Sequence, residues 1–327
     1  MRIDAFAHGL PPRFREEVLD AADEIGDLVN WATLNRLFDV DERMMLMDQL
    51  GIDVQIVTTP SPPLETMFEP EVACRLAELA NREMANLVGQ YPDRLRGVAT
   101  IPLVDPEWAI REVRHAVTEL GLLGPLIYTH VMGRSLDQTA LEPFWDEVES
   151  LGAPVWLHPD RPRTSPDYAD EEASRYGLFL VLGWPYETSV AMARLVLSGV
   201  MARHPNLEVI VHHGGGMIPF FHRRIEVNYQ AGQRRVQAPT DGTVDIGRDL
   251  RRFYVDTVLQ GANSALDTSI DFFGSDHVLF ATDMPFGPGD GLQFAKSSLE
   301  SVEQLPEPQC EVILGENAIK LFGIDRF

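Results

Sequence analysis

Short runs of apolar, often β-branched residues recur along the chain, separated by longer stretches with a helical spacing of apolar positions. Within the runs the hydrophobic character is continuous rather than alternating, which is typical of strands buried on both faces of a parallel sheet. Eight strands are predicted on this basis, at Arg2–Phe6, Asp53–Thr59, Gly97–Leu103, Pro125–Thr129, Pro154–Leu157, Leu207–Val211, Phe253–Thr257 and His277–Ala281.

Helices are predicted between the strands, and some of them start with recognisable capping residues. One begins with Pro106 in its first turn, and Asp105 directly before it is the expected N-cap. The predicted helices are Glu71–Tyr91, Pro106–Leu120, Ala140–Leu151, Thr188–Arg203, Asn263–Phe273 and Gln309–Phe322. Strands and helices that alternate in this way predict an α/β fold, a (β/α)8 TIM barrel. No Pro-, Gly- or Ser-rich linker divides the chain, so residues 1–327 are expected to form one domain.

Two connecting segments are longer than a minimal barrel requires. Gly9–Asp41 follows the first predicted strand, and Asp160–Glu187 follows the fifth. Both leave their strands at the same end of the predicted barrel, and loops of this length usually carry function or act as lids. We therefore expect long loops after strands 1 and 5 on the functional face.

Acidic residues outnumber basic ones, with 50 Asp and Glu against 27 Lys and Arg and a formal net charge of −23. Such a surface repels nucleic-acid phosphates and anionic lipids, so binding to nucleic acid or to a membrane is not expected. No run approaches the roughly 20 apolar residues that span a bilayer, and the N-terminal residues do not resemble a signal peptide. The sequence therefore predicts a cytoplasmic globular protein.

Histidines gather where predicted strands end, which in a (β/α)8 barrel is the face that carries active sites. The polar residues at these strand ends are His8, His130, His158, His212, His213 and Asp283. Imidazole and carboxylate groups that converge from separate strands are suited to zinc, manganese or iron, with positions left for a substrate. Any one of these residues could instead cap its strand, but their gathering on one face favours a shared site.

The turn after the sixth predicted strand reads HHGGGMIPFF, residues 212–221. Three glycines let the backbone turn sharply and approach a ligand closely. His213 beside this turn is suited to general acid–base chemistry near neutral pH, whereas His212 is expected to point into packing. A phosphate-binding turn is the weaker alternative.

Several longer segments occur in a particular order and spacing. They include IDAFAHGLPP at 3–12, YPDRLRGVATIPL at 91–103, PVWLHP at 154–159, HPNLEVIVHHGGGMIPFFHRRI at 204–225 and LFATDMPFGP at 279–288. With these segments the chain resembles, over nearly its whole length, the amidohydrolase-related family that contains aminocarboxymuconate-semialdehyde decarboxylase and γ-resorcylate decarboxylase.

The resemblance implies one divalent metal ion, zinc or manganese, held by His8, His158 and Asp283. It also implies that His213 is the catalytic acid or base, with Asp283 as a second residue that helps to move a proton. Relatives commonly form homodimers, and the resemblance implies the same for this chain.

Other residues are expected beside the metal ligands or in contact with the substrate. Glu187 matches a family glutamate and is expected to orient a histidine. Arg161 and Arg175, in the second long segment, are suited to hold a substrate carboxylate, although they could equally be solvated loop charges. His130 is expected near the substrate, as a residue that could also act without a metal.

The chain departs from the family pattern at position 6, where a second histidine usually precedes His8 by two residues. Phe6 stands there instead, and phenylalanine cannot ligate a metal. Three protein ligands with water or substrate still make a catalytic zinc site, so weaker binding, a different metal and loss of the metal all stay open. Phe6 is also expected to form an apolar wall beside the substrate.

The expected activity is metal-dependent, non-oxidative decarboxylation of a small aromatic or unsaturated carboxylic acid. The same ligands suit a hydrolase or hydratase of a related carboxylate, because a metal-bound water can attack a carbonyl group. A third alternative is a metal-free barrel that binds a small ligand without turnover, and Phe6 is the residue that keeps it open.

Overall fold

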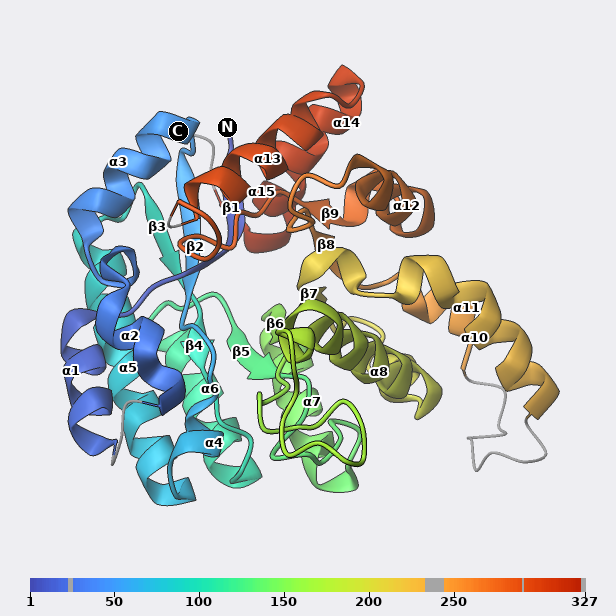
Figure 1. Cartoon of the computed structure of the whole chain (residues 1–327), viewed down its shortest axis with the longest axis horizontal. Helices are drawn as coiled ribbons and strands as arrows, with labels where there is room; N and C mark the ends of the chain where they lie inside the picture. Colours follow the sequence, from blue (N-terminus) through green and yellow to red (C-terminus); the bar gives the residue numbers. More distant parts are fainter. Residues whose placement is uncertain (23–25, 233–243, 290, 325–327) are drawn as a thin grey trace.

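The computed structural model describes residues 1–22, 26–232, 244–289 and 291–324 of the 327-residue chain. Its strands lie at the centre and its helices surround them (Figure 1). The strands are β1 (Ile3–His8), β2 (Val54–Thr58), β3 (Leu95–Gly97), β4 (Ala99–Thr100), β5 (Pro125–Tyr128), β6 (Val155–His158), β7 (Val209–Val211), β8 (Tyr254–Asp256) and β9 (Val278–Leu279).

All the described strand pairs are parallel, and neighbours follow the order of the chain from β1 to β3 and from β4 to β9. The amide of Val98, between β3 and β4, donates to the carbonyl of Val57 at 3.1 Å, so β3 and β4 form one interrupted barrel strand. The barrel closes where the amide of Ala5 donates to Phe280 at 2.8 Å and the amide of Asp283 donates to Phe6 at 3.1 Å. The predicted (β/α)8 barrel is confirmed.

The helices form the outer layer of the barrel. The α-helices are α1 (Pro12–Ala21), α2 (Val29–Thr33), α3 (Val40–Leu50), α4 (Leu64–Met67), α5 (Pro70–Gln90), α6 (Pro106–Thr118), α7 (Glu142–Leu151), α8 (Trp184–Leu197), α9 (Val200–Arg203), α10 (Ile218–Gly232), α11 (Ile246–Leu250), α12 (Asn263–Phe273), α13 (Leu292–Glu303), α14 (Glu307–Glu311) and α15 (Asn317–Phe322). Short 3₁₀ turns are η1 (Gly26–Leu28), η2 (Asn35–Leu37), η3 (Thr139–Leu141), η5 (His213–Gly215) and η6 (Ser275–His277), and π-helical turns are η4 (Phe179–Gly183) and η7 (Val312–Glu316).

The predicted helices are present, with some differences in their bounds. The side chain of Asp105 accepts from the amide of Trp108 at 3.0 Å and caps α6 as expected. The single helix predicted at Thr188–Arg203 is instead divided into α8 and α9, because Gly199 adopts a left-handed φ of 84° between them. The third barrel strand begins earlier than predicted, at Leu95, and ends at Thr100.

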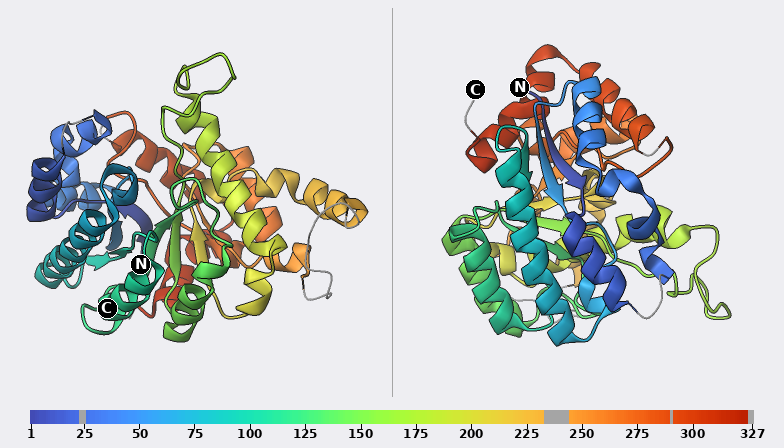
Figure 2. Two further views of the ribbon diagram at one scale, coloured as in Figure 1. Left: turned by 90° about the horizontal axis from the view of Figure 1, so that it is seen from below. Right: turned by 90° about the vertical axis from the view of Figure 1, so that its left-hand side faces the viewer.

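The two long segments differ in their local structure. Gly9–Asp41 carries α1, α2 and short 3₁₀ turns, whereas Asp160–Glu187 has no helix before η4. Figure 2 shows the yellow-green loop of the second segment projecting from the barrel. None of the helices in the described part of the chain is long and apolar enough to cross a membrane.

The barrel interior is filled by side chains that alternate along the strands. Trp156 of β6 and Ile210 of β7 are fully buried in the same apolar cluster as Phe6. Because side chains two residues apart in a strand point to the same face, His158 and His212 follow Trp156 and Ile210 toward the barrel axis. The strand period thus directs these two imidazoles into the mouth of the barrel.

A buried polar network supports the closure between β1 and β9. The carboxylate of Asp4 accepts from the Gln55 side chain at 2.7 Å and from the amide of Thr282 at 3.0 Å. The guanidinium of Arg43, on α3, donates to Gln55 at 2.6 Å and also to the carbonyl of His8. Burial raises the pKa of Asp4 to about 6, although its hydrogen bonds act in the opposite direction. The network fixes the end of β1 from two sides.

Gly124→Ala is expected to destabilise the barrel, because a Cβ at position 124 would overlap the backbone carbonyl of Pro154 on the neighbouring strand. Overpacking of this kind costs about 1–3 kcal/mol. Gly89→Ala in α5 is the matched control, since its Cβ position is in open space with respect to the described residues outside its own stretch of helix. A helical alanine there should stabilise by up to about 1 kcal/mol. Urea unfolding measures the change in the free energy of unfolding for each variant. Equal changes in Gly124→Ala and Gly89→Ala would contradict the packing argument.

Candidate active site

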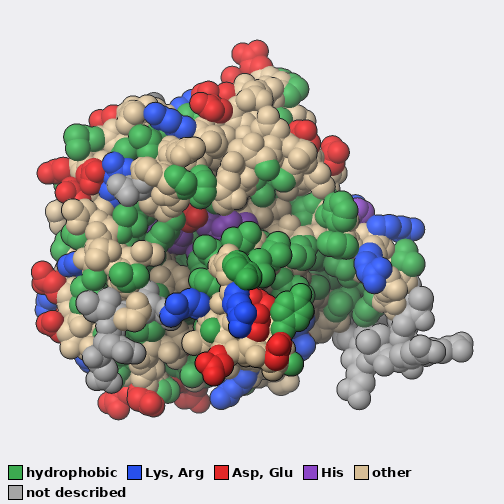
Figure 3. Space-filling model, in the orientation of Figure 1, with side chains coloured by type: hydrophobic (Ala, Val, Ile, Leu, Met, Phe, Trp, Pro, Cys, Tyr) green, Lys and Arg blue, Asp and Glu red, His purple; other side chains and the backbone are tan. Residues whose placement is uncertain are grey.

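Polar side chains meet at the carboxyl ends of the barrel strands. His8 and His158 are the last residues of β1 and β6, His212 and His213 follow β7, and Asp283 lies beyond β9. Figure 3 shows histidine side chains at the base of a hollow on the face that Figure 1 presents. The structure therefore brings together the predicted residues His8, His158, His213 and Asp283, and adds His212 to them.

His8 and His158 each use Nδ1 for a hydrogen bond within the protein. His8 Nδ1 lies 2.9 Å from the hydroxyl of Thr58, which itself donates to the carbonyl of Ala7, so the imidazole must be the donor. His158 Nδ1 lies 2.7 Å from the carbonyl of Pro159, which can only accept. In both rings the proton is on Nδ1, and Nε2 carries the free lone pair.

The Nε2 atom of His8 faces a carboxylate. It lies 3.1 Å from Oδ1 of Asp283, and among the described residues it has no hydrogen-bond partner. Two lone pairs at this distance repel each other unless a proton or a cation lies between or beside them. The same oxygen lies 3.3 Å from Nε2 of His212, so either a proton on His212 or a bound cation can offset this repulsion.

His212 is held between two carboxylates. Its Nδ1 is hydrogen-bonded to Oδ2 of Asp256, and its Nε2 lies 3.3 Å from Oδ1 of Asp283. The other oxygen of Asp256 accepts from the amides of Gly214 at 3.2 Å and Val258 at 3.1 Å, so this carboxylate is fixed in place. The expectation that His212 serves only packing is wrong, because both of its ring nitrogens contact site carboxylates.

The electrostatics of the site separate the histidines into two kinds. Burial lowers the pKa of His8 and lowers that of His158 well below the usual value, so both rings are neutral at pH 7. Burial would also lower the pKa of His212, but the carboxylates of Asp256 and Asp283 outweigh it and raise the pKa to about 10. Burial alone would raise the pKa of Asp283, yet its contact with the protonated His212 holds it well below its usual range.

His213 differs from His212 in the surroundings of its ring nitrogen Nδ1. Its Nδ1 is buried and is without a hydrogen bond to any described residue, and its ring centroid lies 6.2 Å from that of Trp184. Burial and the nearby His212 lower the pKa of His213 to about 4, so its imidazole is neutral. A neutral imidazole with an unused nitrogen is suited to take up a proton from a ligand.

Two overlapping groups of side chains could hold a metal ion among the described residues. His8, His158 and His212 form one group, and His212, His213 and Asp283 form the other, with the ligand atoms of each group within 4.8 Å of one another. Neutral imidazoles and an ionised carboxylate are the forms in which these residues bind metals. The donor set therefore fits a divalent ion, and the predicted ligands are divided between the two groups.

Phe6 lies beneath the imidazoles and is completely buried. Its ring stacks on that of His212 at 4.1 Å with an interplanar angle of 23°. It contacts the ring of His158 edge-on at 6.0 Å. Phe6 is thus the apolar floor under the site rather than an exposed wall.

The remaining predicted residues lie outside this cluster. His130 Nε2 lies 3.7 Å from Asp160, and its Nδ1 accepts from the amide of Gly133. Glu187, in the first turn of α8, pairs with Arg161 at 3.0 Å and not with a histidine. Arg175 pairs with Glu171 at 3.4 Å, and 63% of its side chain is exposed in the loop.

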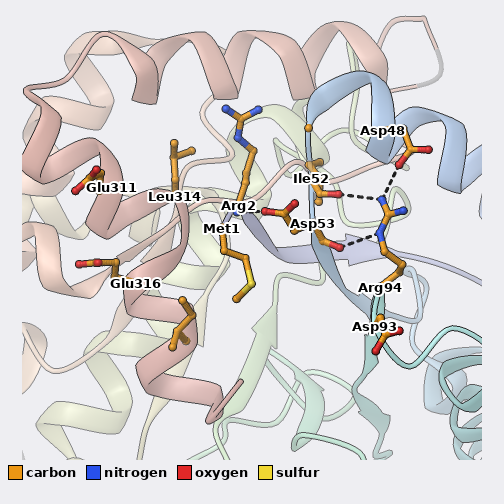
Figure 4. A pocket seen from close by; sticks show the side chains of 12 residues that line it. Met1, Arg2, Asp48, Ile52, Asp53, Asp93, Arg94, Glu311, Leu314 and Glu316 are labelled. Atoms are coloured by element: carbon orange, nitrogen blue, oxygen red, sulfur yellow. Dashed lines mark hydrogen bonds and ion pairs between the residues drawn. The ribbon is translucent and has the colours of Figure 1, made fainter. Parts of the chain in front are cut away.

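A pocket of about 1130 Å³ lies at the other end of the barrel (Figure 4). It is lined by residues that precede β1 and β2, including Arg2 and Asp53. Two of its carboxylates have partners within the pocket: Asp53 accepts from the amide of Arg2 at 2.7 Å, and Asp48 accepts from Arg94 at 2.8 Å. This end of a (β/α)8 barrel serves stability, so the histidine cluster remains the candidate active site.

Sequence reasoning missed the pairing of His212 with Asp256. The two-residue period of the strand could have predicted that His212 faces the barrel axis, since it lies two residues beyond the inward-facing Ile210. Sequence reasoning also missed Trp184. Its ring contacts that of His158 at 5.2 Å, and its Nε1 is buried without a hydrogen-bond partner among the described residues. Trp184 starts α8, and no periodic pattern distinguishes that position.

Fold and site together define a (β/α)8-barrel protein with imidazole and carboxylate groups gathered at the carboxyl ends of its strands. A family model described as Amidohydrolase matches residues 3–324, and the chain belongs to this family. The resemblance inferred from the sequence segments is thereby confirmed.

Two relatives and two solved structures define the neighbourhood of the chain within this family. The chain is 31% identical to 2-amino-3-carboxymuconate-6-semialdehyde decarboxylase of Dictyostelium discoideum, over 88% of this chain and 77% of that protein. It is 33% identical to γ-resorcylate decarboxylase of Rhodococcus jostii, over 89% of this chain and 90% of that protein.

Both structures cover nearly all of the chain at 26% identity. One is 5-carboxyvanillate decarboxylase of Sphingomonas paucimobilis, with a TM-score of 0.84 and coverage of 99% of each chain. The other is a dihydroxybenzoic acid decarboxylase of Polaromonas with bound manganese and the inhibitor 2-nitroresorcinol, with a TM-score of 0.82 over 100% and 98% of the two chains. All four of these proteins are decarboxylases.

Without bound metal, the stability of the protein is expected to fall as the pH rises above neutrality. The pKa of His212 is raised from 6.5 to about 10 on folding, so its stabilising protonation is complete below pH 6.5 and is lost as the pH approaches and passes 10. Each unit of pKa shift corresponds to about 1.4 kcal/mol. The free energy of unfolding is therefore expected to fall by a few kcal/mol between about pH 7 and about pH 9.5.

Urea unfolding in the presence of a chelator measures this dependence. The control is His212→Asn, which retains every other titrating group and should show a flatter pH profile. Identical profiles for the two proteins would contradict the assignment of the charge to His212.

Proposed function

We propose that the chain is a metal-dependent, non-oxidative decarboxylase that acts on a small aromatic or unsaturated carboxylic acid. One observation carries the proposal: neutral imidazoles with free Nε2 atoms converge with an ionised Asp283 in a chain whose relatives are decarboxylases. The close contact between His8 Nε2 and Asp283 supports a cation at this point.

His8, His158 and Asp283 would hold one divalent ion, manganese or zinc. Manganese is supported by the Polaromonas decarboxylase, whose structure contains it, and zinc by the imidazole-rich donor set. When bound, the ion supplies a Lewis acid that stabilises negative charge on the substrate oxygens while the carbon–carbon bond breaks. Thr58 and Pro159 orient the two imidazoles by accepting from Nδ1.

His213 is the proposed proton carrier. Loss of carbon dioxide leaves an electron pair on the substrate carbon, and a proton must arrive there. The neutral imidazole of His213 takes a proton from an acidic group of the bound substrate and passes it to this carbon. Asp283 is the weaker candidate for this role, because its carboxylate is also a proposed ligand of the divalent ion.

Aromatic side chains flank the imidazoles and support a planar substrate. Phe286 contacts the ring of His8 at 5.3 Å, and Trp184 contacts that of His158 at 5.2 Å. Both rings are only partly buried, and the unpartnered Nε1 of Trp184 offers a hydrogen-bond donor. Arg161 packs against Gly183 beside Trp184, so it is the better of the two loop arginines to meet a substrate carboxylate. Arg175 and His130 stay as proposed outer contacts.

Carbon dioxide release from hydroxybenzoates and muconate-type acids tests this function. His213→Ala is expected to lower kcat by about 10²- to 10⁴-fold, the usual contribution of general acid–base catalysis, and to leave the bound metal in place. His115→Ala on α6 is the matched control, since its partly exposed imidazole pairs with Glu119 and is not part of the histidine cluster.

Other outcomes would favour the other functions. Incorporation of oxygen from labelled water without loss of carbon dioxide would identify a hydrolase. Ligand-induced thermal stabilisation without turnover would identify a binding protein. Full activity of His213→Ala would remove this residue from the mechanism.

We also infer a homodimer, from an exposed apolar patch beside the site. Its members lie in η4 and at the starts of α8 and α10, and they are Leu180, Val181, Leu182, Tyr186, Phe220 and Phe221. The two regions adjoin, because the amide of Met217 donates to the hydroxyl of Ser189 at 2.7 Å. Hydrophobic side chains gather next to the hollow in Figure 3, and such patches usually mark contact surfaces.

The dimer is tested by light scattering after size-exclusion chromatography. Wild-type protein should have twice the 36.6 kDa chain mass. The double variant Val181→Glu, Phe220→Glu should be monomeric, because two charges would lose their hydration in the interface. Met45→Glu, a change at another exposed apolar residue on α3, should remain dimeric. A monomeric wild type would refute the inference.

A cytoplasmic location is part of the proposal. Cys74 and Cys310 are both free thiols. This state is usual in compartments that keep cysteines reduced.

A further inference from the structure

The predicted metal ligands leave one imidazole of the site without an assigned role. His212 is completely buried at the carboxyl end of β7 and stacks on Phe6, the residue that cannot ligate. It is the only side chain that belongs to both candidate metal groups of the described residues. Its position therefore requires an explanation beyond packing.

The hydrogen bonds of His212 follow the pattern of the two predicted histidine ligands. In His8 and His158, Nδ1 donates to an oxygen of the protein and Nε2 is left free. In His212, Nδ1 is bonded to the carboxylate of Asp256, and Nε2 lies toward Asp283 at 3.3 Å. A histidine that donates to a carboxylate through one nitrogen is the usual arrangement for a metal ligand at the other.

The adjacent His213 provides a contrast within the same turn. Its Nδ1 has no partner among the described residues, so no hydrogen bond at this atom fixes its tautomer. Asp256, in comparison, is itself fixed by the amides of Gly214 and Val258. The protein orients His212 and leaves His213 free to exchange a proton.

We propose that His212 is a direct ligand of the divalent ion and supplies from β7 the coordination that Phe6 cannot supply from β1. The site would then contain three imidazoles, from His8, His158 and His212, together with Asp283. Asp256 acts as a positioning residue that holds the His212 ring. This inference rests on the proposed metal-dependent function and extends it to the ligand set.

Metal affinity separates this proposal from a purely structural role of His212. Zinc and manganese binding is measured by competition with a chelator and by mass spectrometry of the dialysed protein. His212→Ala is expected to weaken binding by more than about 100-fold, beyond the 10- to 100-fold typical of residues that only orient a ligand. His213→Ala is the matched control and should bind the metal within a few-fold of wild type.

An exchange of ligands between the two stacked positions tests the geometry directly. The rings of Phe6 and His212 lie 4.1 Å apart, so an imidazole at position 6 would occupy neighbouring space. The double variant Phe6→His, His212→Ala should therefore regain most of the affinity lost in His212→Ala. X-ray absorption of zinc-loaded wild type should show three imidazole ligands, a result that does not depend on the folding of any variant.

The outcomes distinguish this inference from the proposed function. Wild-type protein that binds about one equivalent of metal through two imidazoles, with unchanged affinity in His212→Ala, would overturn the ligand role of His212 and leave the decarboxylase proposal standing. Wild-type protein that binds neither zinc nor manganese would overturn both.

Discussion

The site depends on the closure of the barrel between its first strand and the segment that follows its last. Backbone hydrogen bonds from Asp283 to Phe6 and from His8 to Met284, at 3.1 and 2.7 Å, join residues that lie at opposite ends of the chain. Asp4 and its buried partners Gln55 and Thr282 strengthen the same seam. This closure brings Nε2 of His8 to 3.1 Å from Asp283, so the contact that most favours a cation forms only in the complete barrel.

Burial then gives the side chains of the site their chemical character. Removal from water makes the charged form of an imidazole unfavourable, so His8, His158 and His213 are neutral and retain lone pairs for a cation or a proton. His212 is the exception, because Asp256 and Asp283 supply two negative charges against one ring. A divalent ion would replace the proton of His212. Its positive charge would offset the two carboxylates that lie beside the apolar floor of the pocket.

The sequence predicts this architecture well where the information is local. Continuous apolar runs identify the barrel strands. The rule that polar residues at strand ends face the site selects His8, His158, His213 and Asp283, but it also selects His130, which lies outside the cluster. Prediction from the sequence fails for the partners of individual charged side chains. Glu187 pairs with Arg161, 26 positions away, instead of with a histidine, and Arg175 pairs with its near neighbour Glu171. The pairing of His212 with Asp256 joins two adjacent strands across 44 positions of the chain, a register that no local pattern encodes.

Two residues of the site have an unfavourable backbone conformation. His213 and Asp283 adopt left-handed φ angles of 57° and 60°, a conformation that is unfavourable by roughly 1–2 kcal/mol for residues other than glycine. Glycine at either position would relieve this strain and remove the side chain on which the proposed chemistry depends. A change that improves the backbone here would therefore remove the proposed proton carrier or a proposed metal ligand, which is an activity–stability trade-off.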